Sequence, residues 1–139
     1  MKWTLATGVL LSMLSFSAAA DDCTSGAGTA ITQTDLEEQV VCGTSATNSD
    51  TWQEHHGLIS GGGVLTEFAL GTNPVDPTHV VGSWSISGNT VTYTYSGGSS
   101  YSFDVYSTVS GAITFCEDTG TGTVATATLI SSATPVGCD

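Results

Sequence analysis

The stretch Val80–Ser96, VVGSWSISGNTVTYTYS, decides the fold. Gly88-Asn89 has the composition of a two-residue hairpin turn, and apolar or aromatic residues alternate with serine and threonine on both sides of it. The cross-strand pairs that follow from this turn are Ser87 with Thr90, Ile86 with Val91, and Trp84 with Tyr93. The stretch therefore predicts an antiparallel β-hairpin with one aromatic, apolar face and one polar face.

Alternating runs continue on both sides of this hairpin, divided by Gly, Pro, Asn and Ser, which is typical of an antiparallel all-β domain. Thr34 and Glu37 are spaced as a capping box that opens one short N-terminal helix. Further strands are expected over residues 52–56, 64–70, 101–106, 112–116 and 124–130, with an eighth near 40–42. We expect a single antiparallel meander of about seven or eight strands, forming a small up-and-down barrel; a β-sandwich is the alternative.

The tripeptide Gly82-Ser83-Trp84, followed by a hairpin of alternating aromatic residues, resembles the Gly-x-Trp strand of lipocalins and of the avidin-like barrels grouped with them as calycins. The resemblance covers residues 81–95 and implies an up-and-down meander that closes or nearly closes. It carries over no ligand. The tripeptide stands mid-chain here, whereas it marks the first barrel strand in lipocalins, and the basic residue that covers its tryptophan in lipocalins has no counterpart.

The N-terminus predicts export from the cytoplasm. Lys2 precedes an apolar run from Trp3 to Phe16, and Ala18-x-Ala20 is a suitable cleavage site. We expect residues 1–20 to be a signal peptide that is removed, and residues 21–139 to be a single secreted or periplasmic β-domain.

The charged residues are almost all acidic. Lys2 is the one lysine or arginine, against thirteen aspartates and glutamates. Nucleic acids and anionic membranes are bound mainly through Lys and Arg, so neither is expected as a partner. A cationic protein or a small apolar ligand is favoured instead. No spacing in the sequence indicates a metal site or a cofactor motif, and neither is expected.

Four cysteines in an oxidising compartment predict two disulfides, for which three pairings are possible. Cys42 and Cys116 both end runs that have the pattern of a strand, which favours a Cys42–Cys116 disulfide. Cys23–Cys138 then ties the two ends of the domain together.

The stretch Ser49–Gly57, SDTWQEHHG, holds the densest set of titratable side chains. In a strand Trp52, Glu54 and His56 share one face, and Gln53 and His55 take the other. The first face is either a solvated rim of the domain or the lining of a cavity. If this face lines a cavity, the candidate ligand-binding residues are Trp52, Glu54, His56, Glu67, Trp84 and Tyr93. The following loop, residues 57–63, is rich enough in glycine to move as a lid.

Three functions are open on the sequence alone. The favoured one is a small, disulfide-bonded, acidic binding protein whose ligand the sequence does not identify. The second is a structural subunit that associates through exposed strand edges. The third, and least favoured, is a small enzyme that uses Glu54 and His56 as acid and base.

Overall fold

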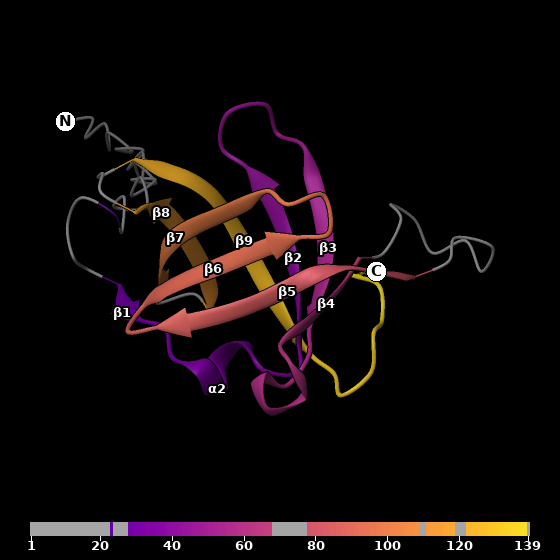
Figure 1. The fold of residues 1–139 in the computed structure, drawn as a ribbon. Coiled ribbons are helices and arrows are strands. Elements are labelled where there is room, and N and C mark those ends of the chain that lie inside the picture. The colour runs from indigo at the N-terminus through magenta and orange to yellow at the C-terminus, as the bar shows by residue number, and fades with distance from the viewer. Residues whose placement is uncertain (1–22, 24–27, 68–77, 109–110, 119–121, 139) are drawn as a thin grey trace, which may run out of the picture.

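The computed structural model describes residues 23, 28–67, 78–108, 111–118 and 122–138, and these residues form a β-barrel (Figure 1). Within them, nine strands make one antiparallel sheet in the order β1-β7-β6-β5-β4-β3-β2-β9-β8. The strands are β1 Thr29–Ala30, β2 Gln39–Ser45, β3 Thr51–His56, β4 Val64–Glu67, β5 His79–Ser87, β6 Thr90–Tyr95, β7 Ser100–Ser107, β8 Ala112–Glu117 and β9 Thr123–Ser131. The expected signal peptide, residues 1–20, lies outside the described residues and stays a prediction.

The sheet closes on itself. Each strand from β2 to β8 pairs with the next along the chain, and β9 returns to pair with β2 from Gln39 opposite Ser131 to Ser45 opposite Ala125. Strand β1 pairs with the end of β7. The eight strands β2–β9 are therefore a closed up-and-down barrel, as the sequence predicted, and the β-sandwich alternative is not adopted.

The hairpin of residues 80–96 has the register that its sequence predicted. Trp84 lies opposite Tyr93, Ile86 opposite Val91 and Ser87 opposite Thr90. Gly88 in the turn has a φ of 64°, in the left-handed region where glycine pays no steric penalty. The strand expected over residues 64–70 is described as far as Glu67, and its last three residues lie outside the described part.

One end of the barrel is closed by helical turns. Helix α2, Gln33–Leu36, and the 3₁₀ turn η1, Ile59–Gly61, both lie at the lower end in Figure 1. They are joined by a hydrogen bond from the Ile59 amide to Glu37 Oε1, at 2.9 Å. The residues buried to 1% exposure or less in the core cluster are Leu36, Val41, Leu65, Val91, Val105 and Ile113. Each such side chain contributes about 2 kcal/mol by its removal from water.

The helix begins earlier than the sequence indicated. The expected capping box of Thr34 with Glu37 is wrong, because Thr32 is the N-cap residue and Asp35 is its partner. Asp35 Oδ2 accepts hydrogen bonds from the Thr32 amide at 2.7 Å and from the Thr32 hydroxyl at 2.6 Å. The capping box therefore lies two residues nearer the N-terminus than predicted, and its acidic partner is an aspartate whose side chain reaches the N-cap.

The glycine-rich loop of residues 57–63 belongs to the closed end. The Trp84 indole donates to the Gly57 carbonyl at 2.9 Å, and the Trp84 amide donates to the Gly63 carbonyl at 2.7 Å. Gly63 has a φ of 57°, and a side chain there would meet the Trp84 carbonyl at 2.2 Å. The loop is thus fastened to β5, and the expectation that it moves as a lid is not supported by its position.

The disulfide pairing predicted from the sequence is wrong. Cys23 is bonded to Cys116 with a Cα–Cα distance of 5.6 Å, and Cys42 to Cys138 with 5.9 Å. Cys42 lies on β2 and Cys116 on β8, with β9 between them. Neighbouring strands are about 4.8 Å apart, so those two residues, which also lie opposite different residues of β9, are separated by at least about 10 Å. That is beyond the span of about 7 Å that a disulfide can bridge.

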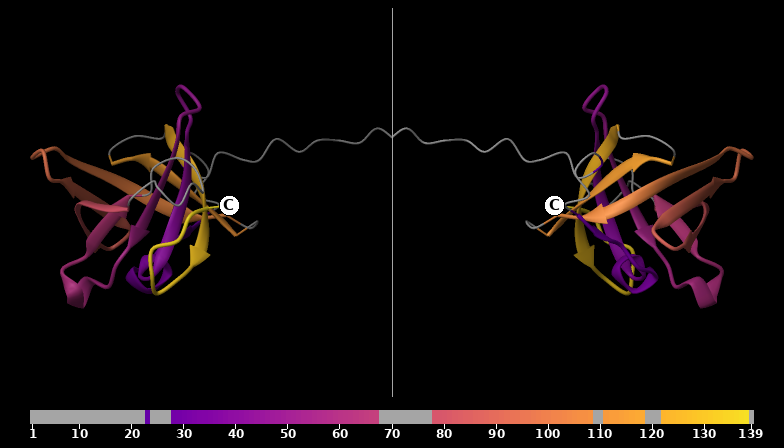
Figure 2. Two further views of the ribbon diagram at one scale, coloured as in Figure 1. Left: turned by 90° about the vertical axis from the view of Figure 1, so that its right-hand side faces the viewer. Right: turned by 90° about the vertical axis from the view of Figure 1, so that its left-hand side faces the viewer.

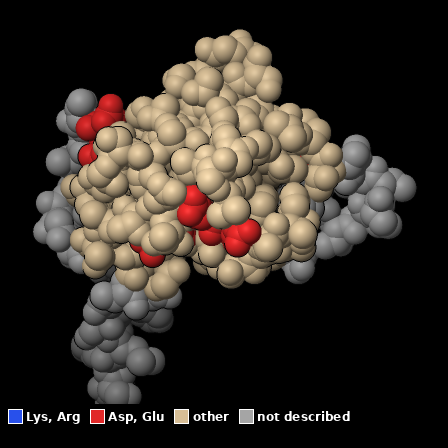
Figure 3. Space-filling view, turned by 60° about the horizontal axis from the view of Figure 1, so that its bottom comes forward, with Lys and Arg blue, Asp and Glu red and all other residues tan. Residues whose placement is uncertain are grey.

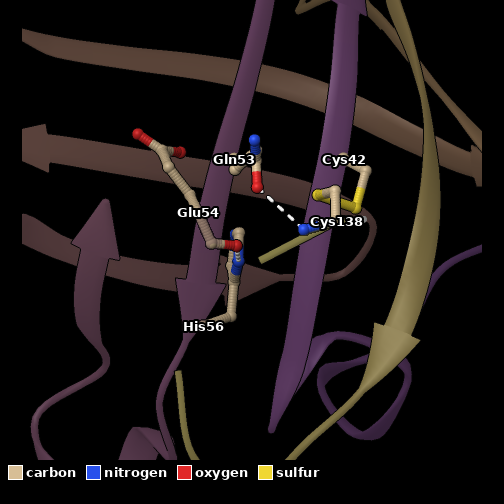
Figure 4. Close-up of a disulfide and its surroundings, with 5 residues drawn as sticks. All are labelled: Cys42, Gln53, Glu54, His56 and Cys138. Atoms are coloured by element: carbon tan, nitrogen blue, oxygen red, sulfur yellow. Dashed lines mark hydrogen bonds between the residues drawn. A yellow bond between two sulfur atoms is a disulfide. The ribbon is translucent and has the colours of Figure 1, made fainter. Parts of the chain in front are cut away.

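The C-terminal segment, residues 132–138, is attached to the outer face of β2 and β3, where Cys138 lies beside Cys42 and Gln53 (Figure 4). Its last described residue is bonded to Cys42, and the Cys138 amide donates to Gln53 Oε1 at 2.8 Å. His55 Nε2 donates to the Ser132 carbonyl at 2.8 Å. The outward-facing residues of β3 are therefore used to hold this segment, which leaves the inward-facing ones to shape the barrel interior.

A substitution at Gly43 can test how Trp52 packs inside the barrel. Gly43 lies opposite Trp52, and a Cβ at Gly43 would stand 2.1 Å from Trp52 Cζ2. We predict that Gly43→Ala displaces the indole and lowers the free energy of unfolding by about 1–3 kcal/mol, the usual cost of overpacking. Urea denaturation measures it. Gly97→Ala is the control, because a side chain there meets nothing within 4 Å. Equal urea midpoints for the two variants would contradict the predicted packing.

Candidate functional site

A cavity of about 370 Å³ opens at the end of the barrel opposite α2. Its wall comes from the residues that end β2, β6 and β8 and begin β3, β7 and β9, together with their inward neighbours. The lining residues are Ser45, Trp52, Glu54, Tyr93, Tyr95, Tyr101, Phe103, Phe115, Val124 and Ala125. Ligand pockets of small-molecule binding proteins have this size and this apolar, concave character.

Aromatic rings make up most of the cavity wall. Phe115 packs edge-on against Trp52 at a centroid distance of 6.1 Å and against Phe103 at 6.0 Å. Tyr95 and Tyr101 meet in the same way at 6.2 Å. Tyr101 is 52% exposed, so this end of the cavity reaches solvent. Edge-to-face rings of this kind hold one another in place, which gives the wall a fixed shape.

Glu54 is the acidic residue within this aromatic wall. It is 7% exposed, and its Oε1 accepts a hydrogen bond from the Tyr95 hydroxyl at 3.0 Å. Burial raises the pKa of the Glu54 carboxyl above its usual value, the hydrogen bond from Tyr95 opposes that shift, and the negative charge of Glu67 adds to it. Glu67 stands directly opposite on β4. Ionisation of Glu54 in this position therefore carries a cost in free energy that a bound cation would offset.

His56 lies in the packed core beneath the cavity. Its ring is fully buried, and burial lowers its pKa to about 3, so it is neutral at physiological pH. Nδ1 lies 3.3 Å from the Glu54 carbonyl, which can only accept, and therefore carries the proton. Nε2 then accepts from the Tyr93 hydroxyl at 3.0 Å. Trp84 packs against the ring edge at 5.2 Å.

The structure separates the six predicted site residues into three groups. Trp52, Glu54 and Tyr93 line the cavity. His56 and Trp84 lie below it in the packed core. Glu67 is half-buried and is not among the lining residues, and its Oε2 is 3.4 Å from His79 Nε2. In the described part of the chain, no three His, Cys, Asp or Glu residues are grouped as a metal site requires.

Strand alternation in Ser49–Gly57 is as predicted: Glu54 points into the barrel and Gln53 to the opposite face (Figure 4). The sequence did not lead us to four further aromatic residues of the cavity wall, Tyr95, Tyr101, Phe103 and Phe115. Their signal was present, because Tyr95 follows Tyr93 by two residues and Tyr101 precedes Phe103 by two. Residues two apart in a strand share a face, so Tyr95 faces inward with Tyr93. Tyr101 lies opposite Tyr93, so Tyr101 and Phe103 take the same face.

The surface carries a strong negative charge. Figure 3 looks toward the closed end and shows acidic groups with no lysine or arginine among the described residues. Asp35, Glu37 and Glu38 lie in or beside α2 at this end. Among the described residues, no helix has both the length and the apolar character needed to cross a membrane.

Comparison with known proteins identifies no relative. The chain matches no protein-family model, no curated protein and no solved structure. Any function proposed for it therefore depends on the geometry of its own cavity.

His56 gives a prediction for acid stability. An unfolded histidine titrates near pH 6.5, whereas His56 in the folded protein titrates near 3. Between these values the unfolded chain binds a proton that the folded chain does not, so the free energy of unfolding falls as the pH is lowered. The loss approaches about 1.4 kcal/mol per pH unit. The raised pKa of Glu54 acts in the opposite sense, since protonation of Glu54 favours the folded state as the pH falls.

We predict that His56→Gln removes about 2 kcal/mol of the stability loss between pH 6 and pH 4, because the glutamine amide does not titrate. The measurement is urea unfolding at each pH for the unmodified protein and the variant. His79→Gln is the control, since His79 is exposed. If His56→Gln retains the full pH slope, the buried neutral state of His56 is wrong.

Proposed function

We propose that this protein binds a small, mainly apolar ligand in the cavity at the open end of its barrel. The observation that carries the proposal is the cavity itself, about 370 Å³ in volume with six aromatic residues among its ten lining residues. A barrel of eight strands has an interior that side chains can fill or that can hold one small ligand. Here core side chains such as Leu36, Leu65 and Trp84 pack together nearer α2, and the aromatic cavity occupies the other half.

The rigidity of the site supports this proposal. The lining residues of β3, β6 and β7 lie on paired strands, and Phe115 packs edge-on against both Trp52 and Phe103. The two disulfides cross-link the outer surface at β2 and β8. A site built on rigid elements pays little ordering entropy when the ligand enters. Disulfides are typical of proteins outside the cytoplasm, and we include an extracytoplasmic location in the proposal.

The alternative functions have less support. A cationic protein partner is compatible with the acidic surface, but no shaped interface on the described residues favours it over the cavity. Association through strand edges has little support, because strands β2–β9 all have a neighbouring strand on both sides and β1 spans only two residues. Catalysis by Glu54 and His56 is disfavoured because both ring nitrogens of His56 are engaged by neighbouring groups.

A cavity-filling variant tests the proposal. Ala125 lines the cavity and is 4% exposed, whereas its neighbour Thr126 on β9 points to the exposed outer face. We predict that Ala125→Phe weakens binding of the neutral fluorescent probe N-phenyl-1-naphthylamine by at least about tenfold, equivalent to about 1.4 kcal/mol. Thr126→Phe, which adds the same group outside, leaves affinity unchanged. Fluorescence titration measures both.

Two further results make the test decisive. Circular dichroism establishes whether Ala125→Phe is folded, and Tyr101→Ala, at the exposed rim, provides a second cavity variant that overpacks nothing. Equal affinities of all three variants and the unmodified protein would overturn the proposal, as would a failure of both this neutral probe and a cationic aromatic probe to bind the unmodified protein.

A further inference from the structure

The cavity contains an acidic group as well as apolar surface. It combines one buried carboxyl group, Glu54, with the faces and edges of aromatic rings. From this combination we propose that the ligand is an organic cation, an amine or quaternary ammonium group on a small apolar body, with its charge beside Glu54. This inference rests on the proposed function of the cavity and specifies its ligand.

Glu54 is positioned to receive a positive charge. The Tyr95 hydroxyl holds Oε1 at 3.0 Å, and within the described part of the chain Oε2 receives no hydrogen bond. The carboxyl points into the barrel, away from Gln53 and the Cys42–Cys138 disulfide (Figure 4). A carboxylate taken out of water is costly unless it is paired. No lysine or arginine follows Lys2 in the sequence, so the chain offers no such side chain to pair with Glu54 inside the barrel.

The aromatic wall favours the same ligand. Trp and Tyr rings attract a cation over their faces, by about 0.5–1 kcal/mol at exposed sites and about 2 kcal/mol where water is excluded. Trp52, Tyr95 and Tyr101 line the open part of the cavity beside Glu54. A group of such rings with one carboxylate is suited to an ammonium group, because the rings replace part of its hydration and the carboxylate balances its charge.

The other classes of small ligand fit less well. An anion would meet Glu54 and the carboxylate of Glu67, which lies opposite it on β4, with no lysine or arginine among the described residues to oppose them. The hydroxyl of Tyr95 is already committed to Glu54 and that of Tyr93 to His56. A neutral apolar ligand would cover Glu54 without pairing its charge, and so gains less from this carboxyl group than a cation does. A cation is the ligand whose entry pairs that charge.

A charged ligand also implies a pH dependence. The titratable groups that face Glu54 are Glu67 from β4, Tyr93 and Tyr95 from β6, Tyr101 from β7 and His56 from its own strand. His56 is neutral, and burial raises the pKa of Tyr93 and Tyr95, so these three stay uncharged in the neutral range. The affinity for a permanently charged ligand should therefore rise with pH as Glu54 loses its proton.

The test compares two probes of the same shape by isothermal titration calorimetry. Benzyltrimethylammonium carries a fixed positive charge, and neopentylbenzene replaces its nitrogen with carbon. We expect the cation to bind at least about tenfold more tightly than the neutral probe, from the combined cation–π and carboxylate contributions. Glu54→Gln should abolish this preference. Glu38→Gln, which removes one negative charge near α2 at the closed end, should retain it.

The outcomes separate this inference from the proposed function. If N-phenyl-1-naphthylamine binds in the cavity but the two shape-matched probes bind equally, or Glu54→Gln keeps the preference, the cation inference is wrong and the cavity proposal stands. If Ala125→Phe leaves cation binding unchanged, the cation binds elsewhere and the inference is also wrong. In the unmodified protein, the affinity for benzyltrimethylammonium should rise between pH 4.5 and pH 8, and a flat profile would overturn the inference without any variant.

Discussion

The pairing of β2 with β9 is the constraint on which the rest of the structure depends. Every other pairing in the barrel joins strands that are adjacent along the chain, whereas this one brings Gln39–Ser45 against the last described strand. Closure fixes which side chains face inward, because a slip of one residue would turn every side chain of a strand to the opposite face. Trp52, Glu54 and His56 face the interior only while β2, on which β3 is aligned, keeps its register with β9.

The distribution of large and small side chains explains why one half of the barrel is hollow. Near α2 the interior is filled by Trp84, His56 and aliphatic side chains. Toward the other end, the wall formed by β2 and β9 carries small residues, with Gly43 opposite Ala127 and Ser45 opposite Ala125. The indole of Trp52 lies over Gly43, but nothing of similar size fills the space beside it. The β2–β3 hairpin projects beyond the other strands at this end (Figure 2).

Short-range patterns in the sequence predicted the fold and part of the site. The Gly88-Asn89 turn determined the Trp84–Tyr93 pair, and alternation separated Glu54 from Gln53, because both depend on neighbours along the chain. The predicted disulfide pairing was wrong because β9 lies between Cys42 and Cys116. This placement of β9 is a result of barrel closure, which no local pattern in the sequence contains. The same applies to His56, whose strand face was predicted, while its burial under the cavity depends on Tyr93 and Trp84 from other strands.

The central claim is that the barrel is open to solvent at Trp52 and packed at Trp84. It is tested most directly by ¹⁹F NMR of protein labelled with 5-fluorotryptophan, with resonances assigned through Trp52→Phe and Trp84→Phe. A change of solvent from H₂O to D₂O should shift the Trp52 resonance and leave that of Trp84, which is 3% exposed, unmoved. If neither resonance shifts, the barrel is filled at both ends and has no cavity for a ligand.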